Sequence, residues 1–551
     1  MGTGQVAFKW RDLKLSETTH EIELAAASLT GPAEVNVTDL RYATGSDGQG
    51  KVSGKVSVKA DIAKSLAAAA PFMGGDKPPA ITGALDYNAD ISQQGKQIVI
   101  RSGGQINNFS FQSGDKTIRE NALKLTQNAA IDLSAHKLTL EKSQVDSKLL
   151  SLSAKGTVDK LDGDKVIDIS GSYKTSWDEL IPLLRQLYPK EMEHVVITGD
   201  SASDFHAVGP IGEKGITPAW RDLKVTGFAL HWISAEAYGL KIGAANLAPT
   251  ISGGQISLPV TDMGANDGTL RLGGVFNMTG KDPIYDLSQK VQVMGKVNIT
   301  PELKEALLTR INPIFSHVAQ ITGSVTLQSS DLNVPLSEAI KHQGTGHGHL
   351  DLSNLYVAPS GEFAGLLKLM GIGDPSAMRL VKMTSVDFQI HDGKISYQNL
   401  GMDLGVVDLV FSGSVGFDDS VEMTVSMPLS RELLVHIGVP PQLASAINGV
   451  RVPVPIIGTR TNFHFGLEKI DLAPLLKQAT ENVAKGLGGV EKMTEKGVGA
   501  AGQAVGGAVG GVGGLLGSHE NPKQEPSSQP SKNQSPPPEK KPKSPLEGLF
   551  K

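Results

Sequence analysis

Apolar and polar residues alternate along most of the chain between residues 6 and 472. The alternation is clearest at residues 386–390 and 421–427, and shorter runs occur at 52–58. Because successive side chains of a strand point to opposite faces, this period of two predicts strands with one apolar and one polar face. Asp392-Gly393, between two such runs, predicts a tight hairpin. The pattern therefore predicts a mostly β fold.

Helical stripes are few and short. Thr300-Pro301 places a capping residue before a proline at the first helical position, and Ser176 begins a capping-box pattern. Pro182 and Pro313 predict kinks or later helix starts, and Gly438 predicts that the last helix consists of two pieces. The predicted helical segments are residues 61–70, 176–188, 300–318 and 431–447.

The four predicted helices recur in one context, each after an alternating strand and before an Ile-Thr-Gly-like step into another strand. The steps are at residues 81–83, 197–199, 321–323 and 457–459. Two further pairs of segments share sequence, 10–14 with 220–224 and 102–106 with 252–256. A repeated strand–helix–strand block predicts an elongated body of similar sheet units. Chance similarity within a β-rich composition is the alternative explanation.

Composition removes several function classes. The chain has 52 basic and 57 acidic residues, a net charge of −5, without the basic excess of a nucleic-acid-binding protein. It has no cysteine, which excludes disulfides, thiolate metal sites and a cysteine nucleophile. Aromatic residues make up only 5% of the chain, so apolar burial must come mainly from Val, Ile, Leu and Ala.

The ends of the chain differ from its body, which we assign to residues 1–485. The first residues match neither a secretory signal nor a myristoylation site, and residues 6–10 already resemble a strand, so we expect a truncated N-terminus with its membrane anchor upstream. Residues 486–517 are rich in Gly and Ala and predict a flexible linker, with a membrane-associated segment as the alternative. Residues 518–551, rich in Pro and Lys, predict a disordered tail that is a candidate contact for an envelope protein.

Candidate chemistry is sparse. His342, His347 and His349 form an H-x4-H-x-H cluster, a possible metal site in the hypothesis of a histidine metalloenzyme. The carboxylate pairs Asp418-Asp419 and Asp262/Asp267 lie near predicted turns, where Asp is favoured for backbone reasons. Neither a P-loop nor a nucleophile elbow occurs. We therefore expect no enzyme, with no catalytic residues, metal site or cofactor.

Four segments near the C-terminal end of the body form a familiar pattern: the hairpin VDFQIHDGKISYQNL, the strands DLVFSGSVGFDDSVEMTVSMPL, the step RVPVPIIGT and the ending IDLAPLLKQA. Together, over residues 384–478, they resemble the C-terminal region of AsmA-like proteins, the group that includes AsmA and TamB. The Ile-Thr-Gly steps extend a weaker likeness over most of residues 6–472. This chain lacks the family's usual N-terminal membrane segment and has residues 460–463 where the family often has a proline.

The resemblance implies an elongated, β-taco-like sheet groove in the periplasm or cell envelope, anchored in the inner membrane through a segment missing here. It implies a role in outer-membrane biogenesis, with phospholipid acyl chains held in the groove and moved between envelope membranes. The family has no catalytic residues to transfer. The apolar face of the best-matched strands supplies the candidate groove residues, which are Phe388, Ile390, Val421, Met423 and Val425. A structural or surface β-repeat scaffold without lipid transport is the alternative, because alternation alone does not separate the two.

Overall fold

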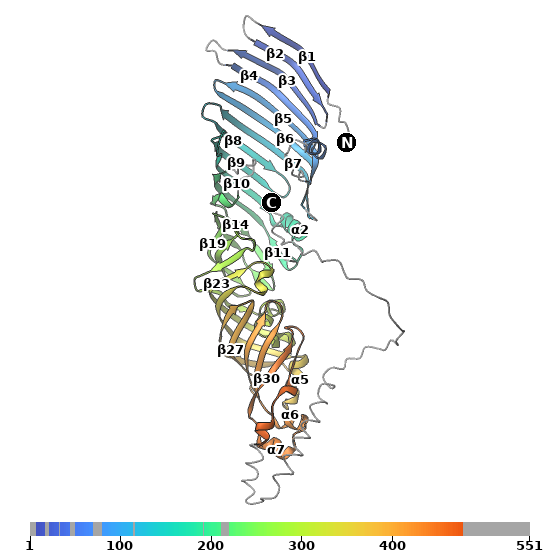
Figure 1. Ribbon diagram of the computed structural model, residues 1–551, viewed down its shortest axis with the longest axis vertical. Coiled ribbons are helices and arrows are strands. Elements are labelled where there is room, and N and C mark those ends of the chain that lie inside the picture. Colours follow the sequence, from blue (N-terminus) through green and yellow to red (C-terminus); the bar gives the residue numbers. More distant parts are fainter. Residues whose placement is uncertain are drawn as a thin grey trace, which may run out of the picture.

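The computed structural model describes residues 7–16, 21–31, 33–44, 50–69, 80–113, 116–190, 192–210 and 220–477. Within this part of the chain, 29 strands form one sheet and two more form a small separate one. The molecule is long and narrow, and its strands follow one another along the long axis, from β1 at one end towards β30 and α7 at the other (Figure 1). The predicted mostly β class is confirmed.

The first ten strands pair in chain order, each antiparallel to the next. One helix, α1 (Ile62–Ala69), lies between β4 and β5. The strands are β1 (Ala7–Ser16), β2 (Glu21–Thr30), β3 (Ala33–Thr44), β4 (Gly50–Asp61), β5 (Ala80–Gln94), β6 (Gln97–Ser113), β7 (Lys116–Asp132), β8 (Lys137–Asp146), β9 (Ser151–Asp159) and β10 (Val166–Ser176).

A region of mostly short strands follows. Helix α2 (Trp177–Leu187) leads from β10 to β11 (Val195–Thr198), and β12 (Asp200–Pro210) continues the sheet by pairing with β10. β14 pairs with β17 in the small separate sheet. The remaining elements of this region are η2 (Trp220–Asp222), β13 (Lys224–Thr226), β14 (Leu230–Trp232), β15 (Ser234–Ala237), β16 (Leu240–Ile242), β17 (Ala245–Leu247) and β18 (Thr250–Ser252).

The strands of the last part are mostly longer, and helices pack against them. The strands are β19 (Gln255–Ala265), β20 (Gly268–Asn277), β21 (Ile284–Leu287), β22 (Val291–Asn298), β23 (Val318–Pro335), β24 (Thr345–Pro359), β25 (Arg379–Met383), β26 (Val386–His391), β27 (Lys394–Asp403), β28 (Asp408–Gly416), β29 (Val421–Pro428), β30 (Arg451–Gly458) and β31 (Phe463–Phe465). The helical elements are α3 (Pro301–Leu303), η3 (Lys304–Leu308), α4 (Thr309–Ile311), η4 (Pro313–His317), η5 (Glu338–Lys341), α5 (Gly361–Leu369), α6 (Arg431–His436), α7 (Pro441–Ala446) and η6 (Leu467–Lys469).

The hydrophobic core lies in this last part. One cluster of buried apolar side chains extends from Met263 to Leu476 and contains both strand and helix residues. Leu308, Phe315 and Phe363, all from helical elements, have no exposed surface. The helices therefore cover the apolar face of the strands around them, and full burial of such a side chain stabilises the fold by roughly 1.5–3 kcal/mol.

The four predicted helical segments are confirmed, and the structure adds α5 and the 3-10 helices η2, η5 and η6. The Thr300 hydroxyl accepts a hydrogen bond from the Leu303 amide (3.1 Å), and Pro313 begins η4, the predicted later start. α6 and α7 are the two predicted pieces of the last segment. The Ser176 side chain, in contrast, makes no capping hydrogen bond, and α5 was not predicted.

Three of the four Ile-Thr-Gly steps have equivalent positions. Gly83, Gly199 and Gly323 have φ values of +146°, +100° and +141°, and each lies where the chain re-enters the sheet after a helix. The Gly199 carbonyl accepts a hydrogen bond from the Trp177 amide (3.0 Å), and the Gly323 carbonyl accepts one from Ile299 (2.9 Å), so these glycines close the sheet beside the helix start.

The other sequence similarities do not correspond in structure. Gly458, of the fourth step, has a similar φ of +128° but lies at the C-terminal end of β30, where it pairs with Phe463. Trp10 lies in a strand whereas Trp220 begins a 3-10 helix. Residues 102–106 are the interior of β6, whereas residues 252–256 make the turn between β18 and β19. The repeat is therefore limited to the strand–helix–strand units of the first three steps.

Candidate functional site

An unbroken row of paired residues crosses the first ten strands on one face. Directly opposite residues of antiparallel strands share a face of the sheet, so the register connects the two ends of this row residue by residue. Gly104 is the only residue of the row without a side chain, and it faces Tyr87. A Cβ added at Gly104 would lie 2.8 Å from the Tyr87 Cα and 3.0 Å from Cδ2 of its ring, so the tyrosine leaves no room for a side chain there. The row is Phe8, Leu29, Val35, Val58, Tyr87, Gly104, Leu125, Val145, Leu152 and Tyr173.

A second row runs beside it on the same face and is also apolar. It contains Ile91, Ile100, Ala129, Leu140 and Ile169, with Gly156 between the last two. We call the side of β1–β10 that carries the two rows the apolar face. It is formed by residues far apart in sequence, and the alternation within each strand is what brings them to one side.

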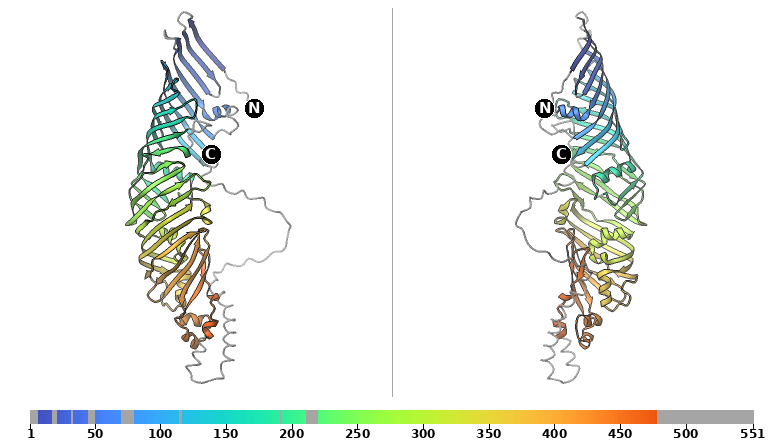
Figure 2. Two further views of the ribbon diagram at one scale, coloured as in Figure 1. Left: turned by 60° about the vertical axis from the view of Figure 1, so that its left-hand side comes forward. Right: turned by 90° about the vertical axis from the view of Figure 1, so that its right-hand side faces the viewer.

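Exposure of the apolar face falls along the molecule. Phe8 is 64% exposed and Leu29 40%, the middle of the first row is half-buried, and Tyr173 at its other end is 8% exposed. Along the described chain, the first apolar residue to be buried is Ala129. Figure 2 shows the first strands as a single layer. The apolar face of β1–β6 is therefore accessible over the described residues.

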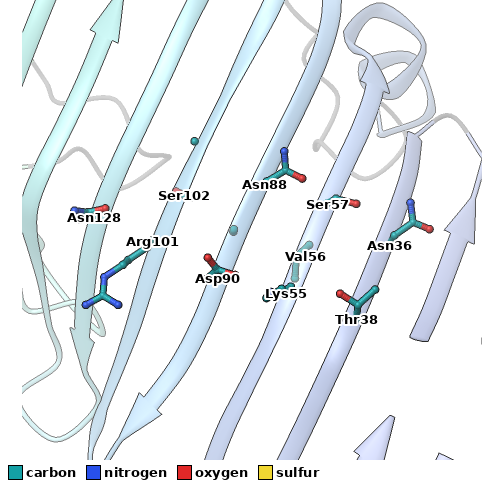
Figure 3. Close-up of a pocket in the computed structure, with 12 residues that line it drawn as sticks. Asn36, Thr38, Lys55, Val56, Ser57, Asn88, Asp90, Arg101, Ser102 and Asn128 are labelled. Carbon is teal, nitrogen blue, oxygen red and sulfur yellow. The ribbon is translucent and has the colours of Figure 1, made fainter. Parts of the chain in front are cut away.

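The opposite face of the same strands is polar. Lys55, Asp90 and Arg101 follow one another across β4, β5 and β6 in register. With Asn36, Asn88 and Asn128 they line a shallow hollow of about 540 Å³, whose polar side chains Figure 3 shows. This lining suits water and not hydrocarbon, so the two faces of the sheet have different chemistry.

The apolar face ends where a loop segment packs onto β10. The Phe228 ring lies 5.0 Å from the Tyr173 ring, and the Tyr173 hydroxyl hydrogen-bonds Ser201 Oγ (2.7 Å) and the Ala229 carbonyl. Burial raises the pKa of Tyr173, which keeps this phenol a hydrogen-bond donor. Trp177 Nε1 donates to the His231 carbonyl (2.6 Å). We call this contact the closing segment, residues 228–232.

The five groove residues predicted from the sequence lie beyond the closing segment, in the packed core. Phe388, Met423 and Val425 are 7%, 3% and 0% exposed, and Ile390 and Val421 are partly buried against the same cluster. Most of their surface is covered by that cluster, and Met423 also borders a shallow hollow of about 380 Å³ together with Gly413 and Ile456. By comparison, Phe8 and Leu29 at the start of the first row are 64% and 40% exposed.

Sequence reasoning did not select this surface as a site. The alternation at 52–58 was the available signal, since Val58 lies in the first row. That signal is the same for a covered and an uncovered face. The exposure of Phe8 and Trp10, 64% and 61%, depends on what packs against them and has no local signature.

The candidate chemical groups are dispersed. His349 Nδ1 lies 2.7 Å from an Asp387 oxygen and His347 Nδ1 lies 3.8 Å from Asp331, so each histidine has its own carboxylate. Asp419 lies in a turn with φ +68° and pairs with Arg460 (2.7 Å). Within the described ranges, no three His, Cys, Asp or Glu side chains gather as metal ligands would.

Two predicted segments, 486–517 and 518–551, lie outside the described residues, as does the predicted anchor. Among the helices that the structure does describe, none has the length and apolar content to cross a membrane. In comparisons with known proteins, no protein-family model, no curated protein and no solved structure matches this chain.

Proposed function

We propose that this protein binds the acyl chains of phospholipids on the apolar face of β1–β10. The observation that carries the proposal is the unbroken row from Phe8 to Tyr173, with an accessible start and a closed end. Removing apolar surface from water is favourable by about 25 cal/mol per Å². A long exposed apolar surface on a folded chain is a typical mark of an interaction site.

The dimensions suit hydrocarbon chains. The six strands β1–β6, over which the face is accessible, are spaced about 4.8 Å apart and extend over roughly 24 Å. One leaflet of a bilayer has a hydrocarbon depth of about 15 Å, half of the core thickness. The face is therefore long enough for acyl chains laid along it, while the polar head groups stay at its rim in water.

The resemblance to AsmA-like proteins supports a wider role for the same site. We infer a protein of the periplasm or cell envelope, anchored in the inner membrane, that takes part in outer-membrane biogenesis by moving phospholipid between membranes. The closing segment favours loading from the β1 end, because Phe228 already occupies the space next to Tyr173. Lipid would then leave by the same end.

The test compares two neighbouring residues on opposite faces of β6. Ile100→Asp places a charge in the second apolar row, and Arg101→Asp places the same charge on the polar face. Each purified full-length variant is extracted with organic solvent, and bound phospholipid is measured by mass spectrometry. We expect Ile100→Asp to lower the bound lipid several-fold and Arg101→Asp to leave it unchanged.

Two results would contradict the proposal. Equal amounts of bound lipid in both variants would show that the lipid does not bind to the apolar face. An unmodified chain without extractable lipid would show that the protein does not bind phospholipid. Thermal unfolding of the two variants is the control, because a folded Ile100→Asp chain is required for the comparison.

One observation favours the second candidate, a structural scaffold. The part from Met263 to Leu476 is a packed core in which Leu308, Leu355 and Val425 have no exposed surface. Such a core leaves no space for a ligand and suits a rigid support. An unmodified chain without lipid would favour this function.

A further inference from the structure

We infer that the outer edge of β1 is a docking site for one strand of another protein, apolar on one face and acidic on the other. β1 lies at the end of the molecule (Figure 1) and, among the described strands, pairs only with β2. An edge strand presents unpaired backbone groups that can bind an added strand. Its ten residues are long enough for such pairing.

The apolar side chains of β1 suit this interpretation. Phe8, Trp10 and Leu15 are 64%, 61% and 69% exposed, more than the apolar residues of the strands that follow. Their partners on β2 cover one flank only. A strand on the free flank would cover the other and would extend the apolar face by one strand.

The polar side of β1 selects the charge of the partner. Lys9, Arg11 and Lys14 alternate with the apolar residues. Lys14 faces Glu23 (3.9 Å) and Arg11 lies 3.5 Å from its neighbour Asp12, but the residues that face Lys9 and Arg11 on β2 are the uncharged Ser28 and Ala26. The other flank of this basic row therefore favours carboxylates, because opposite charges on facing strands attract and like charges repel.

The same charges disfavour a second copy of this chain. Antiparallel pairing of two β1 strands that keeps Phe8 beside Leu15, and hence the apolar sides together, places Lys9 directly opposite Lys14. Shifting this register by two residues places Arg11 opposite Lys14 in one direction and Trp10 opposite Arg11 in the other. Charge complementarity thus points to a different protein.

The irregularity in the middle of β1 does not block pairing. Asp12 has φ +54°, and bulged positions often protect edges. Asp39 in β3 has the same conformation, φ +55°, and β3 pairs with β2 on one side and β4 on the other. Both aspartates precede a leucine, so β1 has the local structure of an interior strand.

In β3 and β23, one of the two strands that flank the Asp-Leu step carries a glycine beside the leucine, whereas the other carries a leucine. At Gly54, next to Leu40, an added Cβ would lie 3.2 Å from Leu40 Cδ1, and at Gly346, next to Leu332 of the Asp331-Leu332 step, it would lie 2.8 Å from Leu332 Cδ1. We therefore expect a glycine in the partner strand beside Leu13.

The probe is a synthetic peptide with the 12-residue sequence of β4 in which Ser53, Lys55 and Ser57 are replaced by Glu. It retains Gly54, and in the register of β4 on β3 its three carboxylates would face Lys14, Arg11 and Lys9. The matched control has Lys at the same three positions. Binding to the full-length chain is followed by anisotropy of a fluorescent label on the peptide.

We expect the acidic peptide to bind at least about tenfold more tightly than the lysine peptide, since three facing pairs change from attraction to repulsion. The protein variant Lys9→Glu/Arg11→Glu should reverse this preference. Backbone amides of residues 7–16 should exchange with solvent more slowly when the acidic peptide is bound.

Three results would overturn the inference. Equal binding of both peptides would mean unspecific apolar contact. Protected amides in β1 before any peptide is added would mean that the edge is already occupied, by a second copy if the unmodified chain is then dimeric in solution and by another segment of this chain if it is monomeric. The outcome is independent of the proposed lipid binding, because Lys9 and Arg11 lie on the polar face and should not alter bound lipid.

Discussion

Strands with similar alternation have an exposed apolar face in the first region of the molecule and a covered apolar face in the last region. In β1–β6 the apolar face is a single layer of half-buried and exposed side chains, whereas from β19 to β31 it is covered by helices and forms a core. Strand alternation is similar in both. The difference therefore comes from the connections between strands.

The helices explain why only one region has a core. α1 has the sequence IAKSLAAA, whose small alanines bring little apolar volume to the face. The segment between β22 and β23 brings Leu308, Ile311, Ile314 and Phe315, all 0–1% exposed. Because burial energy grows with apolar area, the second segment fills the face and α1 does not.

The sharpest test of this comparison is removal of one aromatic ring from each region. We expect Phe363→Ala, at a site with 0% exposure, to lower the free energy of unfolding by about 3–5 kcal/mol through lost burial and a cavity. Trp10→Ala, at a site with 61% exposure, should change it by less than about 0.5 kcal/mol. Denaturant unfolding measures both.

A large loss in Trp10→Ala would contradict the picture of an open first region. It would mean that the Trp10 ring is packed in solution against something that the described residues do not include.

A smaller effect is expected at the glycines that the two regions share. Gly83→Ala and Gly323→Ala should each lower stability by about 1–3 kcal/mol, because φ is +146° and +141° and a Cβ would meet Ile106 Cγ2 at 2.8 Å or the Asn354 carbonyl at 3.0 Å. The matched control is Gly103→Ala, where the nearest atom is 3.4 Å away. Thermal unfolding of the three variants should show a larger loss of stability for Gly83→Ala and Gly323→Ala than for Gly103→Ala. An equal loss in all three variants would contradict the structural equivalence of the two steps.

Local patterns predicted much of the fold and little of the site. The Asp392-Gly393 hairpin, the Thr300 cap and the break before Pro441 depend on neighbouring residues, and all are present. Phe388 and Phe8 have similar alternating contexts, yet one is 7% and the other 64% exposed. Tertiary contacts between segments far apart in sequence decide which face stays exposed. The alternation within one strand does not depend on these contacts and therefore cannot predict them.

The junction between the regions should respond to loss of one hydroxyl group. Tyr173→Phe removes the hydrogen bonds to Ser201 and the Ala229 carbonyl and keeps the ring against Phe228. We expect a loss of about 1–2 kcal/mol, because Ser201 and the carbonyl remain buried with fewer partners. Hydrogen exchange at residues 228–232 should accelerate while β23 and β24 stay unchanged, and no change at 228–232 would mean that the hydroxyl does not hold the closing segment.

The smallest expected effect is a dependence on pH that differs between the regions. Burial lowers the pKa of His317, which packs against Phe463 (4.6 Å between ring centroids), although the carboxylate of Glu362 opposes the shift. Below the ordinary value of 6.5 the unfolded chain takes up a proton at this position more readily than the folded chain, so the stability of the second region should fall as the pH decreases from 7 towards 5.

In the first region the pKa values of Asp132 and Asp159 are lowered from 3.8, so their contribution to stability is lost only at more acidic pH. Hydrogen exchange, compared between pH 7 and pH 5.5, should show that the opening rate rises more around η4 than in β7 as the pH is lowered. His317→Gln should remove most of that difference. If the difference persists in this variant, another group causes it.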